Sequence, residues 1–331
     1  MVQIFKMKKI LIIGGGGYVG AELTNSLISK GYDVSVFDLF IYGENVFNSS
    51  KLKKIKGDVR EITKFENIFQ NIDCVIHLAC ISNDPSYDLD PELGKSINYS
   101  CFEPLIKISK DNGVKKFIYA SSSSVYGIKN TPDVKENESL EPLTDYSKFK
   151  VLCEEVCHKY RDSSFKTIIL RPATVCGFSG RQRLDLVVNI LTNLAYHNRH
   201  IKVFGGDQLR PNIHIKDMVR SYIHVIESDF DFEKENIFNV GYNNFKVIDI
   251  AEKVKNVIGD DVTIERVPTN DNRSYHVSSE KIKKVLNFQN EFNLDDAISD
   301  LKNAFSSKVL KDSLENKIYF NIKMMQSIKL K

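Results

Sequence analysis

The sequence predicts an α/β protein, in which a doubly wound parallel sheet is joined to a smaller interleaved α/β lobe. Two observations point to this fold class. Apolar runs rich in Ile and Val alternate with helical patterns through the first half of the chain. These runs lack the polar alternation of a half-exposed strand, so both faces of the sheet must be covered. The length of 331 residues also suits about two domains.

The predicted strands and helices follow one another in the order that a parallel sheet requires. The strands are Lys9–Ile13, Asp33–Asp38, Lys53–Lys56, Cys74–Leu78, Lys116–Ala120 and Thr167–Leu170. The helical segments between them are Ala21–Lys30, Ile62–Phe69, Phe102–Asn112 and Asp145–Tyr160. Each helix supplies the crossover that two strands running in the same direction need.

The second half of the chain has a looser rhythm. Helices are expected at Leu184–Tyr196 and Lys216–Glu227, and a late strand near residues 237–250 is expected to return to the sheet. We therefore assign residues 1–175 to the sheet domain and residues 176–331 mostly to the smaller lobe and a C-terminal tail. The tail from residue 313 onward has no assigned role.

Composition excludes several classes of protein. Apolar residues make up 42% of the chain, enough for a packed core, and the net charge of +3 is too balanced for a nucleic-acid-binding protein. The six cysteines contain no C-x-x-C pair, which indicates reduced thiols and no metal site. No apolar run is long enough for a signal peptide or a membrane span. We expect a cytoplasmic protein without a membrane partner.

A glycine-rich loop directly follows the first predicted strand. Glycines at positions 14, 17 and 20 give the pattern G-x-x-G-x-x-G, and a helical segment follows. Such a loop allows a tight turn and lets a helix N-terminus face a pyrophosphate, as in Rossmann-type domains. An acid ends the next strand, 18 residues beyond the last glycine, where it suits a ribose 2′-hydroxyl and repels a 2′-phosphate. We expect NAD as the cofactor, bound by Gly14, Gly17, Tyr18, Val19, Gly20 and Asp38.

The glycine spacing is that of short-chain dehydrogenases. Two further segments resemble the extended members of that group, the NAD-dependent nucleotide-sugar epimerase and dehydratase family. Gly57-Asp58-Val59-Arg60 resembles the adenine-contacting turn, and His77-Leu78-Ala79-Cys80 resembles H-L-A-A with cysteine in place of the second alanine. The resemblance covers about residues 8–290. It implies further NAD contacts from Asp58, Val59, Leu78, Ala79, Cys80 and Asn98.

The pattern Y-x-x-x-K places Tyr146 and Lys150 on one face of a helix. A phenol has a usual pKa near 10, but a neighbouring ammonium and a positively charged nicotinamide ring both favour its phenolate. Tyr146 can then take a proton from a sugar hydroxyl as the carbon gives up hydride, and return it in reverse. Lys150 is expected to hold the nicotinamide ribose as well. Both residues are therefore counted among the cofactor contacts.

A serine-rich segment at residues 121–127 resembles the family's S-S-x-x-V-Y-G run and implies that Ser122 is the catalytic hydroxyl. The family's 4,6-dehydratases carry an acid pair in the next two positions. Ser123 and Ser124 stand there instead, so dehydration is not expected, and both serines are assigned to substrate binding. The GDP-fucose synthase branch is disfavoured, because Ser124 replaces its cysteine and its downstream histidine is missing.

The substrate side of the resemblance departs from the family in places. Arg171-Pro172-Ala173-Thr174-Val175-Cys176-Gly177 resembles R-P-x-x-V-Y-G-P, with Thr174 where many members have a phosphate-contacting asparagine. A later segment at residues 204–217 resembles the element whose arginine binds the nucleotide diphosphate. The resemblance implies substrate contacts from Thr174, Arg210 and Arg273. The arginines of the segment after Gly177, Arg181 and Arg183, are expected to face the sugar or the diphosphate.

These observations predict an NAD-dependent enzyme that oxidises C4 of a nucleotide-activated sugar, with Tyr146, Lys150 and Ser122 as the catalytic group. Dehydrogenation of a GDP-hexose or GDP-heptose, as in surface-polysaccharide synthesis, is our first expectation. A UDP-hexose 4-epimerase using the same residues is the alternative. A non-catalytic NAD(H)-sensing module is an alternative of another class. A homodimer is the family's expectation.

Overall fold

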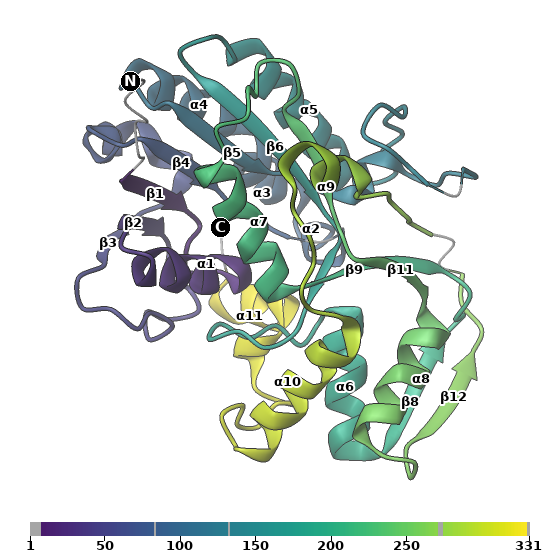
Figure 1. The fold of residues 1–331 in the computed structure, drawn as a ribbon. Coiled ribbons are helices and arrows are strands. Elements are labelled where there is room, and N and C mark those ends of the chain that lie inside the picture. The colour runs from purple at the N-terminus through teal and green to yellow at the C-terminus, as the bar shows by residue number, and fades with distance from the viewer. Residues whose placement is uncertain (1–7, 83, 132, 271–273, 330–331) are drawn as a thin grey trace.

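The computed structural model describes residues 8–82, 84–131, 133–270 and 274–329. Within these ranges, seven parallel strands form the central sheet (Figure 1). In order across the sheet they are β10 (Ile237–Val240), β6 (Lys166–Pro172), β5 (Lys116–Ala120), β4 (Cys74–His77), β1 (Lys9–Ile13), β2 (Asp33–Asp38) and β3 (Lys53–Lys56). Starting from β1 in the sheet, strands β2 and β3 are added on one side, and strands β4, β5 and β6 are then added on the other side of β1. This reversal opens a crevice at the carboxyl ends of β1 and β4, and the predicted fold class is confirmed.

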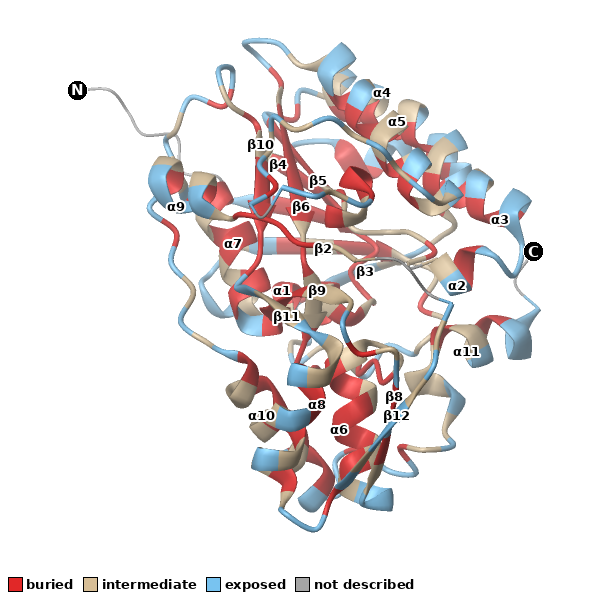
Figure 2. Ribbon diagram, turned by 90° about the vertical axis from the view of Figure 1, so that its right-hand side faces the viewer, coloured by how far each residue is buried: buried red, intermediate tan, exposed pale blue. Residues whose placement is uncertain are grey.

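Helices cover both faces of this sheet. One face packs against α1 (Tyr18–Ser29), α7 (Ile215–Glu227) and α9 (Glu280–Leu286), and the other against η1 (Val59–Phe69), α4 (Phe102–Asp111) and α5 (Asp145–Tyr160). Alternate residues of β1 serve the two faces: Ile10 and Ile12 join the first core, and Leu11 and Ile13 join the second. All four side chains are fully buried. Figure 2 shows that strands β4, β5 and β6 of the same sheet are largely buried too.

The smaller lobe lies below the sheet in Figure 1. Its strands are β7 (Thr174–Cys176), β8 (His200–Phe204), β9 (Leu209–His214), β11 (Asn243–Lys246) and β12 (Thr263–Val267). Its core lies between α6 (Val187–Asn198), α8 (Val247–Ile258) and α10 (Leu294–Ser306). The chain passes between the sheet domain and the lobe more than once. After the first lobe strands, it returns to the sheet domain, where α7 packs on α1 and β10 pairs with β6.

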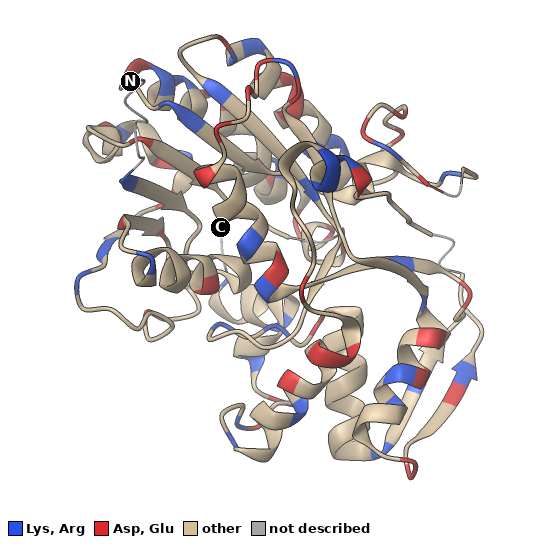
Figure 3. Cartoon of the chain, viewed as in Figure 1, with Lys and Arg blue, Asp and Glu red and all other residues tan. Residues whose placement is uncertain are grey.

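Several shorter elements complete the fold. They are α2 (Asp84–Tyr87), α3 (Pro91–Lys95), the π-helical turn η2 (Ser96–Ser100), the 3₁₀ turns η3 (Ser123–Tyr126) and η4 (Lys317–Tyr319), and α11 (Asn321–Ile328). Basic and acidic residues are interspersed along the ribbon (Figure 3). In the part of the chain that the structure describes, no helix is both long and apolar enough to cross a membrane.

The structure corrects several predicted boundaries. The segment predicted as a helix over Ile62–Phe69 is η1, a series of 3₁₀ turns broken at Glu61 and Phe65. Strand β4 ends at His77, one residue early, and α1 begins at Tyr18 because the glycine loop is shorter than expected. Only the first four residues of the 237–250 segment join the sheet, since α8 and β11 take the remainder into the lobe.

Candidate active site

The glycine-rich loop joins β1 to α1 at the middle of the sheet. Gly14 has φ of +84°, and a Cβ built on it would lie 2.3 Å from the backbone nitrogen of Ala79. A Cβ on Gly20 would lie 2.7 Å from the carbonyl oxygen of Gly14. Backbone therefore packs on backbone at both positions, which only glycine allows. Gly17 has no such close neighbour and lines a cleft at the N-terminus of α1, a position that fits a diphosphate.

The Asp38 carboxylate ends β2 beside this loop. One oxygen accepts a hydrogen bond from the backbone N–H of Gly16 at 2.9 Å, and the other accepts from Phe40 at 2.7 Å. Burial raises the pKa of Asp38, while these two bonds and the nearby Arg181 oppose the rise. The carboxylate is thus fixed in position, with lone pairs left for ribose hydroxyls.

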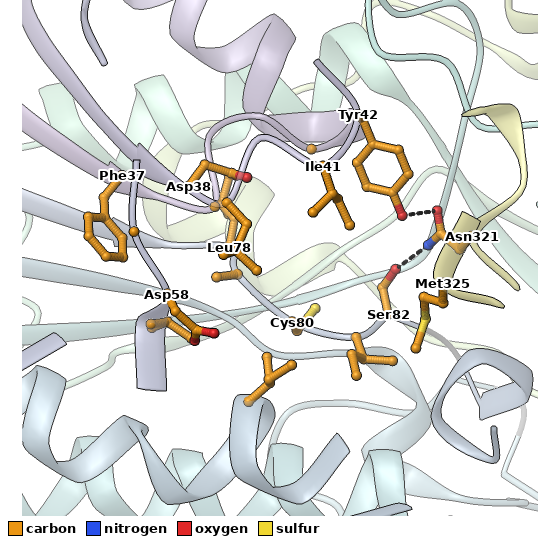
Figure 4. Close-up of a pocket in the computed structure, with 18 residues that line it drawn as sticks. Phe37, Asp38, Ile41, Tyr42, Asp58, Leu78, Cys80, Ser82, Asn321 and Met325 are labelled. Atoms are coloured by element: carbon orange, nitrogen blue, oxygen red, sulfur yellow. Dashed lines mark hydrogen bonds between the residues drawn. The ribbon is translucent and has the colours of Figure 1, made fainter. Parts of the chain in front are cut away.

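Residues 57–59 and 78–82 complete a first cleft with the loop (Figure 4). Asp58 caps η1 and forms an ion pair with Arg60 at 2.6 Å. Burial alone would raise the pKa of Asp58, but the hydrogen bonds from Arg60 hold it below its usual value. Asp58, Val59, Leu78, Ala79 and Cys80 all line this cleft.

Asn98 is an exception among the predicted cofactor contacts. It is buried in η2 and lines neither this cleft nor the neighbouring one. Its side chain bonds both backbone groups of Ile81, at 2.8 Å to the nitrogen and 2.9 Å to the oxygen. Asn98 therefore holds the segment after β4 in place from behind.

The candidate catalytic residues meet where β5 ends. Ser122 caps η3. Its hydroxyl lies near enough to the phenol of Tyr146, in the first turns of α5, to lower the pKa of that phenol. The Lys150 ammonium is 5.7 Å from the centre of the Tyr146 ring and donates to the Ala120 carbonyl at 2.6 Å. The three side chains thus lie together in a second cleft, continuous with the first at the glycine loop.

The surroundings of Tyr146 in the protein raise the pKa of its phenol. Burial is the main cause, and the nearby Cys80 and Asp84 add to it. Arg183 and the Ser122 hydroxyl oppose the rise. Burial therefore favours the protonated phenol, and the positively charged nicotinamide ring of a bound NAD⁺ would favour its deprotonation.

The predicted substrate contacts line the second cleft. Ser123, Ser124, Thr174, Arg181, Arg183 and Arg210 are all found there, and the Ser124 hydroxyl lies 2.8 Å from that of Ser122. Arg273 lies outside the described residues. Tyr18, Val19 and Gly20, predicted to contact the cofactor, line this second cleft too. The Tyr18 hydroxyl already donates to Gly177 in the lobe at 2.6 Å.

Two buried arginines contribute positive charge to this cleft. Arg181 and Arg183 are 4% and 7% exposed. Among the residues that the structure describes, Nε of Arg181 and Nη2 of Arg183 find no hydrogen-bond partner. Burial lowers the pKa of Arg181 to about 10, and Arg183 beside it contributes. Arg183 is paired with Asp185 at 2.9 Å. Partly paired guanidinium groups in a cleft suit a diphosphate.

Sequence reasoning missed several residues of the two clefts. Tyr42, Asp84, Asp185, Asn321 and Met325 all line one or both. Asp84 follows the Leu78–Cys80 segment closely, and that proximity could have indicated it. The last two residues lie in the C-terminal tail, where no motif marks them.

The fold and this site define an NAD-dependent enzyme acting on a nucleotide sugar. The chain belongs to the NAD dependent epimerase/dehydratase family, whose model matches residues 10–241. A UDP-glucose 4-epimerase of Lactobacillus helveticus is 26% identical over 313 residues, which are 88% of this chain and 95% of the relative. The expected cofactor and enzyme class are confirmed.

Solved structures agree with this assignment. The UDP-glucuronic acid 4-epimerase of Bacillus cereus, in complex with UDP-glucuronic acid and NAD, superposes with a TM-score of 0.81 at 25% identity, covering 91% of this chain and 99% of that one. A UDP-glucose 4-epimerase of Thermotoga maritima with UDP-glucose gives a TM-score of 0.82 at 23% identity and the same coverage. The Thermotoga maritima structure shows that the two proteins share the same fold.

Proposed function

We propose that this protein is an NAD-dependent 4-epimerase of a UDP-activated sugar. The observation that carries the proposal is the group formed by Ser122, Tyr146 and Lys150 in the second cleft, beside the serines that replace the acid pair of the dehydratases. The similar curated proteins include several UDP-glucose 4-epimerases. They favour the alternative of our sequence analysis over GDP-sugar dehydrogenation.

The chain's own residues move the proton and hold the sugar. Bound NAD⁺ supplies the hydride acceptor and later the donor. Tyr146 takes the proton from the C4 hydroxyl as hydride leaves C4, and Ser122 donates a hydrogen bond in the same place. Lys150 fixes the phenol ring through its position beside it. Hydride returned to the opposite face of C4, with the Tyr146 proton returned to the oxygen, inverts that carbon.

The arginines of the second cleft serve the nucleotide end. Arg183 is held by Asp185 and donates to Ser82 at 3.0 Å, which leaves its remaining nitrogen for a diphosphate oxygen. Arg210 lines the same cleft from β9. Binding energy at the diphosphate leaves the hexose ring free to present either face of C4.

NMR with separate substrates tests the proposal. The NAD-loaded protein is given UDP-glucose, UDP-galactose or a GDP-hexose, and reduced nicotinamide is followed by its near-ultraviolet absorbance. A C4 epimer of the UDP-sugar, with no net gain of reduced cofactor, is the expected result. A 4-keto product from the GDP-hexose, with reduced cofactor accumulating in equal amount, would establish the 4-dehydrogenase instead.

A further inference from the structure

The C-terminal tail is anchored to the lobe before it reaches the crevice. The Ser313 hydroxyl donates to Asn193 of α6 at 2.7 Å, and the backbone N–H of Leu184 donates to the Tyr319 carbonyl at 2.8 Å. Phe320 packs with Leu184 in a small apolar cluster. These contacts fix the path of the tail, so that α11 lies at the first cleft.

Asn321, the first residue of α11, joins three segments that surround the crevice. Its side-chain oxygen accepts from the Tyr42 hydroxyl at 3.0 Å and from Arg181 at 2.7 Å. Its side-chain nitrogen donates to Ser82 at 3.1 Å, and its backbone N–H donates to Asp185 at 3.0 Å. Tyr42 follows β2, Ser82 follows β4, and the other two belong to the lobe.

These bonds close the open side of the first cleft. Figure 4 shows Asn321 between Tyr42 and Ser82, with Met325 next to it and Asp38 on the far side. Asn321 and Met325 are buried and line the cleft, whereas Gln326 on the same helix is exposed. Because Asp38 and Asp58 line the other side, the cleft between them is the place for the adenosine half of NAD.

We propose that Asn321 and Met325 are cofactor-retaining residues, and that α11 closes the adenosine half of the NAD site. NAD then enters and leaves only when the Asn321 bonds open. The purpose of such closure rests on the proposed function, because a 4-epimerase regenerates its own NAD⁺ in every cycle and gains nothing from releasing it. A dehydrogenase would instead need exchange or a second substrate.

The exchange kinetics of NADH test this proposal directly. The chain contains no tryptophan, so the fluorescence of bound NADH can be followed without interference from that residue. Dissociation is measured by chasing bound NADH with excess NAD⁺, and association by mixing NADH with stripped protein. Asn321→Ala removes the three side-chain bonds that Asn321 makes to Tyr42, Arg181 and Ser82. We expect both rate constants to rise by about tenfold or more, because three hydrogen bonds that hold α11 across the cleft are lost.

Matched variants keep the test decisive. Gln326→Ala, on the exposed face of α11, should leave both rates unchanged. Met325→Ala should also speed dissociation, and it serves if Asn321→Ala fails to fold by circular dichroism. Unchanged rates in the Asn321 and Met325 variants would overturn the proposal, as would faster dissociation without faster association. These rates involve no sugar, so failure to epimerise any UDP-sugar would count against the proposed function alone.

Discussion

The Lys150 ammonium lies 5.7 Å from the centre of the Tyr146 ring, yet its hydrogen bond goes to the Ala120 carbonyl at 2.6 Å. The hydrogen bond to the backbone therefore holds the lysine side chain at the end of β5. Its positive charge lies beside the phenol ring without a hydrogen bond to it. Ser122 follows the same strand end, and its hydroxyl acts to lower the pKa of Tyr146. The strand end thus sets the geometry of the whole catalytic group.

The pH dependence of oxidation should respond to two neighbours of Tyr146 in opposite directions. The base form is required, so activity rises with pH through the pKa of Tyr146. Ser122 lowers that pKa and Asp84 raises it. Ser122→Ala should move the rising limb of kcat/KM to higher pH by roughly half to one pH unit, and Asp84→Asn should move it to lower pH. A shift of the pH profile in the same direction in both variants would contradict these opposite effects on the pKa of Tyr146.

Gly17→Ala should separate cofactor binding from folding. Its φ of −85° is open to any residue, and the added Cβ would meet only the Gly14 carbonyl, at 3.5 Å. The free energy of unfolding should change by less than about 1 kcal/mol. NAD affinity, measured by calorimetry, should fall at least about tenfold, because the methyl group enters the space for the diphosphate.

Gly31→Ala is the matched control for that variant. Gly31 has φ of +86° with no atom within 4 Å of its Cβ position. It should lose about 1 kcal/mol of stability through backbone strain and keep its NAD affinity. Equal NAD affinity in the two variants would show that the diphosphate lies elsewhere.

Asp38→Asn should weaken the preference for NAD over NADP. The negative charge that repels a 2′-phosphate is lost, while the side chain keeps its size. The two carboxylate oxygens accept from Gly16 and Phe40, so an amide nitrogen must face one of these N–H groups. A stability loss of about 1–3 kcal/mol is expected with it. Comparing the dissociation constants of both cofactors checks the prediction, and an unaltered ratio would refute it.

The sheet and the glycine loop were predictable because their signals are local. Buried parallel strands read as continuous apolar runs, and the acid of β2 lies at a fixed place after the loop. The pairing of Ser122 with Tyr146 was predictable from the resemblance. The raised pKa of Tyr146 was not, because it depends on burial and on Asp84 and Cys80, which other segments bring near.

The role of the C-terminal tail was also beyond the sequence. Asn321 meets Ser82 across 239 residues, and nothing local in either segment marks the contact.

The division of the chain at residue 175 remains a prediction, although helix α7, beyond that point, packs on the sheet domain. The sequence pattern of Leu184–Tyr196 started the helix too early, because residues 184–186 belong to the arginine-bearing segment.

The most direct test of the central claim is the proton NMR spectrum of a UDP-hexose incubated with the NAD-loaded protein and, separately, with Tyr146→Phe. The native protein should convert the sugar to its C4 epimer without net reduction of the cofactor. The variant should bind NAD normally and lose at least about a thousandfold of that rate, because no group remains to take the C4 hydroxyl proton. An active Tyr146→Phe variant, or a native protein that leaves every UDP-hexose unchanged, would contradict it.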